Sequence, residues 1–297
     1  MAKNKFVNVG DDWYYMDGNG NAVKGQYPVD NQILYFNPET GVQVKGQFIT
    51  DAQGRISYYD GNSGALKFSG FFTPNGNDWY YAENGYVYKG FKQVAENQDQ
   101  WYYFDQTTGK QAKGAVEVNG QNLYFDKDSG VQVKGDFVTD DAGNTSFYRG
   151  DNGNKLSGGF FTTGNNAWYY ADANGNVAKS FREMDGNWYY FDYAYYFGYT
   201  DGAYPIAYGD DFGWYYFDGD GIKQTNMWAE WDNGTWSWFG NDGKRVDNNW
   251  AKVSGKWYHF DKEGIMQTGW QKINGKWYYM NTCLLYTSPS PRDGATS

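Results

Sequence analysis

The sequence has little of what catalytic and metal sites are commonly built from. Its single cysteine, Cys283, excludes an intramolecular disulfide and a cysteine metal site. Its single histidine, His259, stands where a repeated strand pattern has tyrosine, and we interpret it as a variant of that pattern. The many Asp residues lie mostly at expected turns, where they set the local backbone geometry. Because no nucleophile–base pair, metal cluster or phosphate loop stands out, we expect a non-catalytic chain that binds no metal and no cofactor.

Charge and hydrophobic patterning exclude two further classes. The formal net charge is -10, and an acidic surface repels phosphate backbones, so nucleic acid is not an expected partner. No apolar run is long enough to span a membrane. The sequence does not begin with a signal peptide, so a secreted protein would have lost its true start in this chain.

Aromatic residues are what the sequence has in excess. They make up 22% of the 297 residues, with 30 Tyr, 20 Phe and 14 Trp, alongside 40 Gly. Leu, Ile and Val, which usually fill protein cores, are sparse, so aromatic rings must supply most of the buried area. Disordered chains lack aromatic residues as well as aliphatic ones, so this composition predicts an ordered chain.

The aromatic residues recur in a repeat. A short run such as Trp101-Tyr102-Tyr103-Phe104-Asp105 occurs thirteen times, mostly 20 to 23 residues apart. A longer period of 89 residues relates Lys45-Gly46 to Lys134-Gly135, so four short units form one duplicated block. Each unit predicts a β-hairpin, in which the aromatic run is followed by a loop such as 127–130 and a second alternating run. One hairpin cannot stand alone, so the predicted fold is all-β, a β-solenoid of stacked hairpins.

The character of the repeats predicts four regions. Residues 1–192 carry the duplicated block, and 193–213 break the pattern and predict an irregular joint. Residues 214–281 are richer in Trp. Residues 282–297 abandon the pattern in mid-repeat and resemble the translation of a sequencing adaptor, so we expect them not to belong to the natural protein.

One recurring set of side chains suits a sugar. Side chains of a strand alternate between its two faces, so if the apolar residues face the core, Tyr124, Gln132 and Lys134 emerge together outside. A tyrosine ring can stack on the C–H face of a sugar, while the amide and the ammonium group serve its hydroxyls. The alternative is that the ring packs on the next hairpin and Gln and Lys are an ordinary solvated face. The same set recurs at Tyr35, Gln43 and Lys45, and at Tyr103, Gln111 and Lys113.

The strand pattern followed by Gly and Val-Lys-Gly resembles the cell-wall-binding and glucan-binding repeats of Gram-positive surface proteins. Segments 43–51 and 132–140 are most similar to the glucan-binding region of lactic-acid-bacterial glucansucrases, and the resemblance extends to about residue 281. It implies a secreted or cell-surface fragment of a sucrose-dependent glucosyltransferase, whose pockets hold a dextran-like α-glucan through Tyr and the Gln-x-Lys motif. Val87-Tyr88-Lys89 and Val177-Ala178-Lys179 depart from that motif, which puts pockets there in doubt.

The resemblance leaves other binding functions open. Related repeats hold choline, a quaternary ammonium, in cages of aromatic rings, which would make the chain a choline or teichoic-acid anchor to cell-wall polymers. Toxin-like repeats that bind host glycans and a plain spacer are further alternatives. The candidate aromatic cages are the pairs Trp228 and Trp236, Trp250 and Trp257, and Trp270 and Trp277. For each pair, the simpler interpretation is that the Trp residues lock hairpins together.

Overall fold

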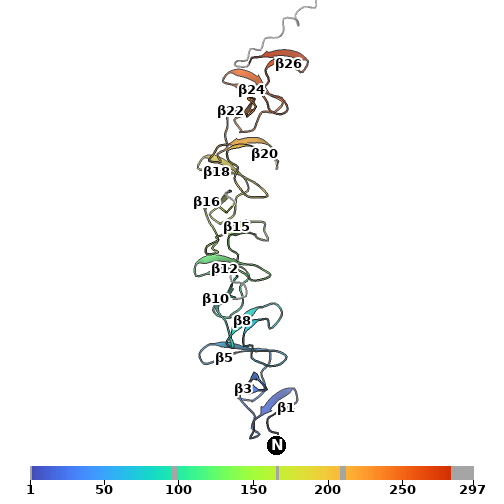
Figure 1. Ribbon diagram of the computed structural model, residues 1–297, viewed down its shortest axis with the longest axis vertical. Coiled ribbons are helices and arrows are strands. Elements are labelled where there is room, and N and C mark those ends of the chain that lie inside the picture. Colours follow the sequence, from blue (N-terminus) through green and yellow to red (C-terminus); the bar gives the residue numbers. More distant parts are fainter. Residues whose placement is uncertain (1, 95–99, 165–166, 208–211, 282–297) are drawn as a thin grey trace, which may run out of the picture. The chain divides into compact units, whose positions relative to one another are not determined.

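The computed structural model describes residues 2–94, 100–164, 167–207 and 212–281 (Figure 1). The chain divides into two compact units, the first comprising 1–138 with 147–156 and the second 139–146 with 157–297. All regular elements in the described ranges are β-strands. Accordingly, this part of the chain has no helix that could cross a membrane.

The strands of the first unit are β1 (Lys5–Val9), β2 (Asp12–Met16), β3 (Gly25–Val29), β4 (Gln32–Phe36), β5 (Gln47–Thr50), β6 (Ile56–Tyr59), β7 (Gly70–Phe72), β8 (Tyr80–Glu83), β9 (Tyr86–Val87), β10 (Gly90–Gln93), β11 (Trp101–Phe104), β12 (Gly114–Val118) and β13 (Gln121–Phe125). Strands β14 (Asp136–Thr139) and β15 (Thr145–Tyr148) have residues in both units. The strands of the second unit are β16 (Gly159–Thr162), β17 (Trp168–Ala171), β18 (Ser180–Met184), β19 (Asn187–Phe191), β20 (Gly202–Ile206), β21 (Gly213–Phe217), β22 (Met227–Glu230), β23 (Trp236–Phe239), β24 (Trp250–Val253), β25 (Lys256–His259), β26 (Gly269–Ile273) and β27 (Lys276–Met280).

The repeating element is a two-stranded hairpin with a tight turn. In the pair β12–β13, Gly114 lies opposite Phe125 and Val118 opposite Gln121. Asn119 and Gly120 between them have φ of 51° and 77°, the left-handed values of the turn that suits the twist of a two-stranded ribbon. The aromatic strand therefore pairs with the strand before it. For this hairpin the expectation that the partner is the run after the aromatic strand was wrong, because the turn at Asn119 and Gly120 closes the hairpin first. Strand β8 pairs on both sides, with β7 before it and with β9 after it.

The segment that follows each aromatic strand, here called the return segment, connects neighbouring repeats. After β13 it makes a single bridge, between Phe125 and Gln132. The amide of Val133 donates to the carbonyl of Tyr124 at 2.8 Å, and the amide of Gln132 donates to that of Trp101, in the preceding repeat, at 2.8 Å. Each return segment thus joins its own hairpin to the one before it.

An Asp or Asn at the end of the aromatic strand fixes the turn into the return segment. Asp126 Oδ1 accepts the amides of Asp128 at 3.1 Å and Ser129 at 2.7 Å, and the Ser129 hydroxyl at 2.7 Å. Hydrogen bonds from Ser129 hold the pKa of the Asp126 carboxyl below its usual range. The turn then passes through Gly130, whose φ is 74°. This turn sets where the return segment meets the strand.

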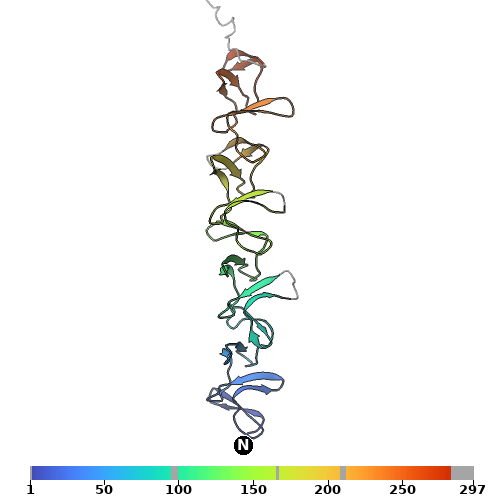
Figure 2. The ribbon, with the colours of Figure 1, turned by 90° about the vertical axis from the view of Figure 1, so that its left-hand side faces the viewer.

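Small cores lie between successive hairpins. Leu123 and Phe125 pack with Val118 of the same hairpin and Tyr103 of the preceding one, all buried. The phenylalanine at this position recurs as a fully buried ring at Phe36, Phe104, Phe125, Phe191, Phe217, Phe239 and Phe260. The hairpins of the first unit follow one another in chain order in both views, from blue to green (Figures 1 and 2).

The predicted all-β solenoid of stacked hairpins is therefore confirmed. The thirteen aromatic runs coincide with strands β2, β4, β6, β8, β11, β13, β15, β17, β19, β21, β23, β25 and β27. The segment 193–213 contains β20, which pairs with β21. The four regions drawn from residue type stay a prediction, and residues 282–297, with Cys283, lie outside the described residues.

Candidate functional site

A pocket of about 320 Å³ opens between the first repeats, and three consecutive repeats line it. The first repeat contributes Phe6 and Trp13, and the return segment after β4 contributes Gln43 and Lys45. The turn after β6 contributes Asn62 and Ser63. The full lining is Phe6, Trp13, Val29, Asp30, Gln32, Leu34, Gln43, Lys45, Asn62 and Ser63. An indole ring, an amide and an ammonium group therefore share one cavity.

The Gln-x-Lys residues of this pocket are held by the next turn. Gln43 Nε2 donates to the carbonyl of Ser63 at 3.4 Å, and Lys45 Nζ donates to that of Asn62 at 3.2 Å. Gly64, with φ of 72°, lets the Gln43 side chain lie against the turn, since a Cβ there would overlap its amide. These bonds use one donor of each side chain, and an amide and an ammonium group have more to offer. The two side chains are positioned before any ligand arrives.

The aromatic wall of the pocket is accessible. Trp13 is 45% exposed and Phe6 is 37% exposed, and their ring centroids lie 6.4 Å apart in an edge-to-face arrangement. The backbone amide of Gln43 donates to the backbone carbonyl of Trp13 at 2.7 Å, which holds the Trp13 backbone beside that of Gln43. A partly exposed indole face beside polar donors is an arrangement that can hold a sugar ring.

A second pocket, of about 300 Å³, repeats this construction around Gln111. Gln111 Nε2 donates to the carbonyl of Ser129 at 3.1 Å, and Lys113 Nζ donates to that of Asp128 at 2.7 Å. Phe71, Trp79 and Tyr102 complete the lining. The glutamine of the Gln-x-Lys motif therefore lines both pockets together with a tryptophan of the preceding repeat, and the lysine lines only the first.

A third pocket, of about 270 Å³ in the second unit, is mainly aromatic. Gly198 and Thr200 stand at the Gln and Lys positions of its return segment. The aromatic side chains around it are Phe160, Trp168, Tyr189, Tyr190, Phe191 and Tyr199. Without the Gln-x-Lys motif, this pocket has the walls of the other two but not their hydrogen-bonding side chains.

The tyrosines expected beside Gln-x-Lys lie elsewhere. Tyr103 is buried in the core, and the rings of Tyr35 and Tyr124 pack against tyrosines of the next hairpin, with centroids 5.3 Å and 5.6 Å apart. The bridge between Phe125 and Gln132 puts the Gln side chain on the phenylalanine face of the strand. That register differs by one residue from the one assumed, and a one-residue shift moves a side chain to the opposite face.

The third Gln-x-Lys set, Gln132 and Lys134, is also held by the next turn and lies beside a tryptophan of the preceding repeat. Gln132 is 9% exposed, and its Nε2 donates to the carbonyl of Asn152 at 3.2 Å. Lys134 Nζ lies 5.6 Å from the centroid of the Trp101 ring. The structure thus brings Gln132 and Lys134 together with Trp101 of the preceding repeat. The tryptophans at the start of the aromatic runs are the residues that sequence reasoning missed, although their position in the repeat could have indicated them.

Of the candidate cage residues, some pack against rings of the next hairpin and others are exposed to solvent. Trp228 has its ring centroid 6.5 Å from that of Trp236 and 4.8 Å from that of Tyr258 in the next hairpin. Trp250 packs on Tyr278 at 5.1 Å. Trp257, Trp270 and Trp277 are 46%, 57% and 45% exposed. Trp228, Trp236 and Tyr258 therefore form a three-ring cluster that draws on two repeats.

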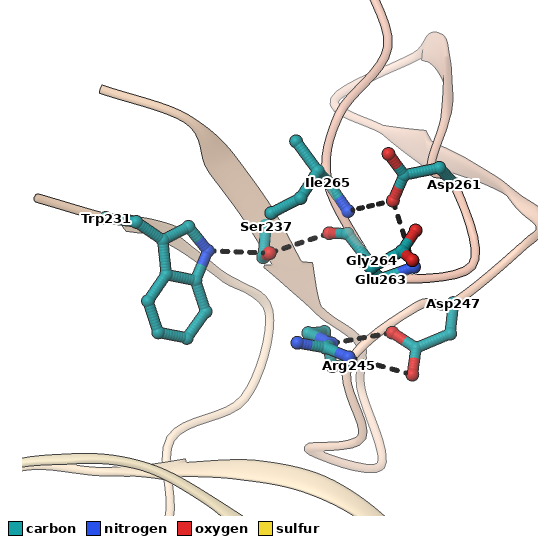
Figure 3. A network of polar contacts seen from close by, with 8 residues as sticks. All are labelled: Trp231, Ser237, Arg245, Asp247, Asp261, Glu263, Gly264 and Ile265. Atoms are coloured by element: carbon teal, nitrogen blue, oxygen red, sulfur yellow. Dashed lines mark hydrogen bonds and ion pairs between the residues drawn. The ribbon is translucent and has the colours of Figure 1, made fainter. Parts of the chain in front are cut away.

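One of the Trp-rich repeats also replaces Gln-x-Lys with a different polar contact, shown in Figure 3. Arg245 and Asp247 stand at the Gln and Lys positions, and Arg245 Nε donates to Asp247 Oδ1 at 2.6 Å. The Arg245 guanidinium lies 4.8 Å from the centroid of the Trp214 ring. Among the described residues, no group of His, Cys, Asp and Glu could hold a metal ion.

Two repeat-family models match the sequence. The choline-binding repeat matches residues 23–71, 112–160 and 248–282. The cell wall binding repeat matches residues 4–22, 89–107, 158–177, 180–193 and 213–223. The matches of the two models alternate from residue 4 to about residue 177, and the cell wall binding repeat alone matches 180–193 and 213–223.

Two curated relatives are streptococcal proteins. Glucosyltransferase-S of Streptococcus mutans serotype c is 31% identical over 188 residues, which are 63% of this chain and 11% of the relative. Glucosyltransferase-I of the same organism is 33% identical over 235 residues, covering 64% of this chain and 16% of the relative. The crystal structure of choline binding protein F from Streptococcus pneumoniae is similar with a TM-score of 0.47 and 20% identity, over 89% of this chain and 98% of that one. The chain spans less than a fifth of either glucosyltransferase.

Proposed function

We propose that this chain holds an extracellular α-glucan at several pockets and does so without catalysis. The premise is that the chain belongs to the family of choline-binding and cell wall binding repeats. The observation that carries the proposal is the first pocket, where the exposed indole of Trp13 faces the same cavity as Gln43 and Lys45. An aromatic face for the C–H surface of a sugar and fixed donors for its hydroxyls are the two requirements for binding a neutral carbohydrate.

The relatives agree with a glucan ligand. Both are glucosyltransferases much longer than this chain, so the parent protein would carry a sucrose-dependent glucosyltransferase domain beside these repeats. In this proposal the parent is a secreted or cell-surface protein of a Gram-positive bacterium, and the module keeps dextran-like glucan near the enzyme.

Repetition compensates for weak single pockets. One pocket can contact only one or two sugar residues, so its own affinity is low. A glucan chain that occupies one pocket holds its next segment at a high effective concentration near another, and avidity rises without new contacts. The pockets at Gln43 and Gln111 both lie in the first unit and can serve one polymer in this way.

Choline is the second candidate ligand, and one cluster favours it. The Trp228 ring lies 6.5 Å from that of Trp236 and 4.8 Å from that of Tyr258, and a quaternary ammonium is attracted to the faces of several aromatic rings. This function would belong to the Trp-rich repeats and would anchor the chain to choline-bearing cell-wall polymers.

Affinity electrophoresis of the full chain through gels that contain dextran tests the glucan proposal, with a choline-loaded resin in parallel. We expect dextran to retard the chain, and the double variant Trp13→Ala/Trp79→Ala to bind about tenfold more weakly, which corresponds to about 1.4 kcal/mol. The double variant Tyr35→Ala/Tyr124→Ala tests the competing tyrosine assignment. Trp270→Ala, which removes an exposed indole from the Trp-rich repeats, is the control. Migration unaffected by dextran, together with retention on choline resin, would move the function to the Trp228 cluster.

A further inference from the structure

One turn of the second unit departs from all turns of its length. In the other turns whose bridged residues lie seven positions apart, the residues after the strand end are small or polar, whereas this turn reads Tyr193-Ala194-Tyr195-Tyr196. The corresponding residues elsewhere are 38–41, 61–64, 106–109, 127–130 and 150–153, and each of those turns has glycine at its fourth position. Three tyrosines therefore occupy places that the repeat otherwise gives to small or polar residues.

The backbone of this turn is held in a strained conformation. Tyr196 stands where the other turns have glycine, and its φ is 65°, a left-handed value that bulky residues rarely adopt. Its ring lies 4.8 Å from Lys179 Nζ, and its hydroxyl makes a 3.3 Å hydrogen bond with Thr145 Oγ1. Strain of this kind persists where the surroundings fix it, and it is concentrated at functional sites.

Asp192 organises the rest of the turn. Its Oδ1 accepts the amides of Ala194 at 2.9 Å and Tyr195 at 2.8 Å, and its Oδ2 accepts the hydroxyl of Tyr199 at 2.9 Å. The Tyr196 amide donates to the Asp192 carbonyl at 2.9 Å. The turn is thus fixed at both ends, and the side chains it carries outward need little ordering when they bind.

Two of the tyrosine rings face solvent. Tyr195 is 70% exposed and Tyr193 is 52% exposed, which are high values for large aromatic side chains. Phe197 supports Tyr195 from behind, because the two rings are stacked with centroids 6.1 Å apart and planes 21° apart. Exposed aromatic surface on a rigid turn indicates a contact site.

We propose that Tyr193 and Tyr195 form an aromatic platform on which a polysaccharide chain stacks the C–H faces of its sugar residues. This site is separate from the three pockets described above, because neither residue lines any of them. The proposal rests on the proposed function, because the ligand is the same α-glucan.

The chemistry of the turn favours a neutral sugar polymer. Tyrosine offers a flat apolar face and a hydroxyl at its tip, which match a surface that alternates C–H and O–H groups. Lys179 Nζ lies 5.5 Å from the ring of Tyr193 and 4.8 Å from that of Tyr196, so its charge is directed to the turn itself. The formal net charge of -10 disfavours an anionic membrane as the occupant.

Hydroxyl-radical footprinting of the full chain with and without dextran reads both kinds of site in one experiment. Dextran is expected to slow the oxidation of Tyr195 in the platform and of Trp13 in the first pocket by about threefold each. Protection of Trp13 without protection of Tyr195 would overturn the platform and leave the proposed function standing. Protection of neither residue would overturn both.

A double variant, Tyr193→Lys/Tyr195→Ser, gives this turn the side chains of Lys127 and Ser129 and supplies the second test. In the Trp13→Ala/Trp79→Ala background, we expect it to reduce the remaining retardation in dextran gels by about threefold. Phe68→Ser removes a 56% exposed ring from the first unit and is the control, with no effect expected. Unchanged retardation, combined with loss of a concentration-dependent dimer in light scattering, would assign the surface to a second copy of the chain and overturn the proposal.

Discussion

The side chain of Gln132 lies against Gly153, in the turn of the next repeat, and donates from Nε2 to the carbonyl of Asn152 at 3.2 Å. A Cβ at position 153 would overlap the Gln132 amide, so Gly153→Ala must displace Gln132 and break this hydrogen bond. Gly153 also has φ of 73°, which alanine adopts only at a cost. We expect urea unfolding to show a lower free energy of unfolding for Gly153→Ala.

Gly120→Ala is the matched control for this prediction. Gly120 has φ of 77°, but no atom would lie within 4 Å of an added Cβ. Both variants carry the backbone cost, whereas only Gly153→Ala loses the contact with Gln132, so it should be less stable by about a further 1 kcal/mol. Equal losses in the two variants would contradict a stabilising role for the Gln132 contact.

Ser237 connects two repeats through a buried hydroxyl. It accepts a hydrogen bond from Trp231 Nε1 at 2.9 Å and donates one to the carbonyl of Gly264 at 2.6 Å (Figure 3). Ser237→Ala leaves both groups without this partner, and we expect it to lower the free energy of unfolding by about 2 kcal/mol. Ser57→Ala is the comparison, because the Ser57 hydroxyl donates to the carbonyl of Gly85 at 2.8 Å. A smaller loss of stability at Ser237 than at Ser57 would argue against a contribution from both hydrogen bonds of the Ser237 hydroxyl.

The turn carboxylates should make the fold sensitive to acid. Hydrogen bonds from turn residues hold the pKa values of Asp60, Asp105 and Asp126 below their usual range. A lowered pKa means that the unfolded chain binds more protons in acid, so stability is present above about pH 4 and is lost as the pH falls further. Melting temperatures measured from pH 6 to pH 2 should fall steeply below about pH 4.

Asp126→Asn isolates one of these turns. Asn37 occupies the same turn position and accepts the amides of Glu39 at 2.8 Å and Thr40 at 3.0 Å, so asparagine can form this turn. The variant should retain its fold at pH 7 and lose less stability than the parent on acidification. An identical pH profile for the two chains would show that Asp126 is not among the groups responsible.

His259 should produce a separate pH effect. Burial lowers its pKa, and the ring packs edge-to-face on Trp250 with centroids 4.9 Å apart. Protonation therefore favours the unfolded chain, and stability should fall as the pH drops below about 6.5. His259→Tyr, which restores the tyrosine of the repeat, should flatten the melting temperature between about pH 5 and pH 7. A slope that persists in the variant would exclude His259, the only histidine, as its source.

The sequence predicts the strands well because their signal is local. Runs such as Trp101 to Phe104 combine aromatic residues with a fixed period, and each forms a strand. The partner of each strand is harder to predict, because the segments before and after it both alternate. The left-handed turn at Asn119 and Gly120 decides the pairing, and this signal was available in the sequence.

The pockets depend on contacts that a single unit does not show. The register of Gln132 follows from the turn that Asp126 builds. The predicted register differed by one residue, which placed the Gln132 side chain on the Tyr124 face of the strand instead of the Phe125 face. Trp101 lies beside Lys134 because the return segment bonds to the preceding repeat. Such proximity results from stacking, whereas composition and spacing describe one repeat at a time.

The 89-residue duplication has a genetic consequence once the contacts of the return segments are known. Gln43 lies against Gly64 just as Gln132 lies against Gly153, so the two copies present the same joining surfaces. Recombination between the duplicated gene segments that excised residues 44–132 would place Gln43 against Gly153 and create no new kind of interface. Alleles of such a gene can therefore differ in length by whole blocks while every remaining joint keeps its hydrogen bonds, and selection can adjust the number of ligand sites without redesigning any of them.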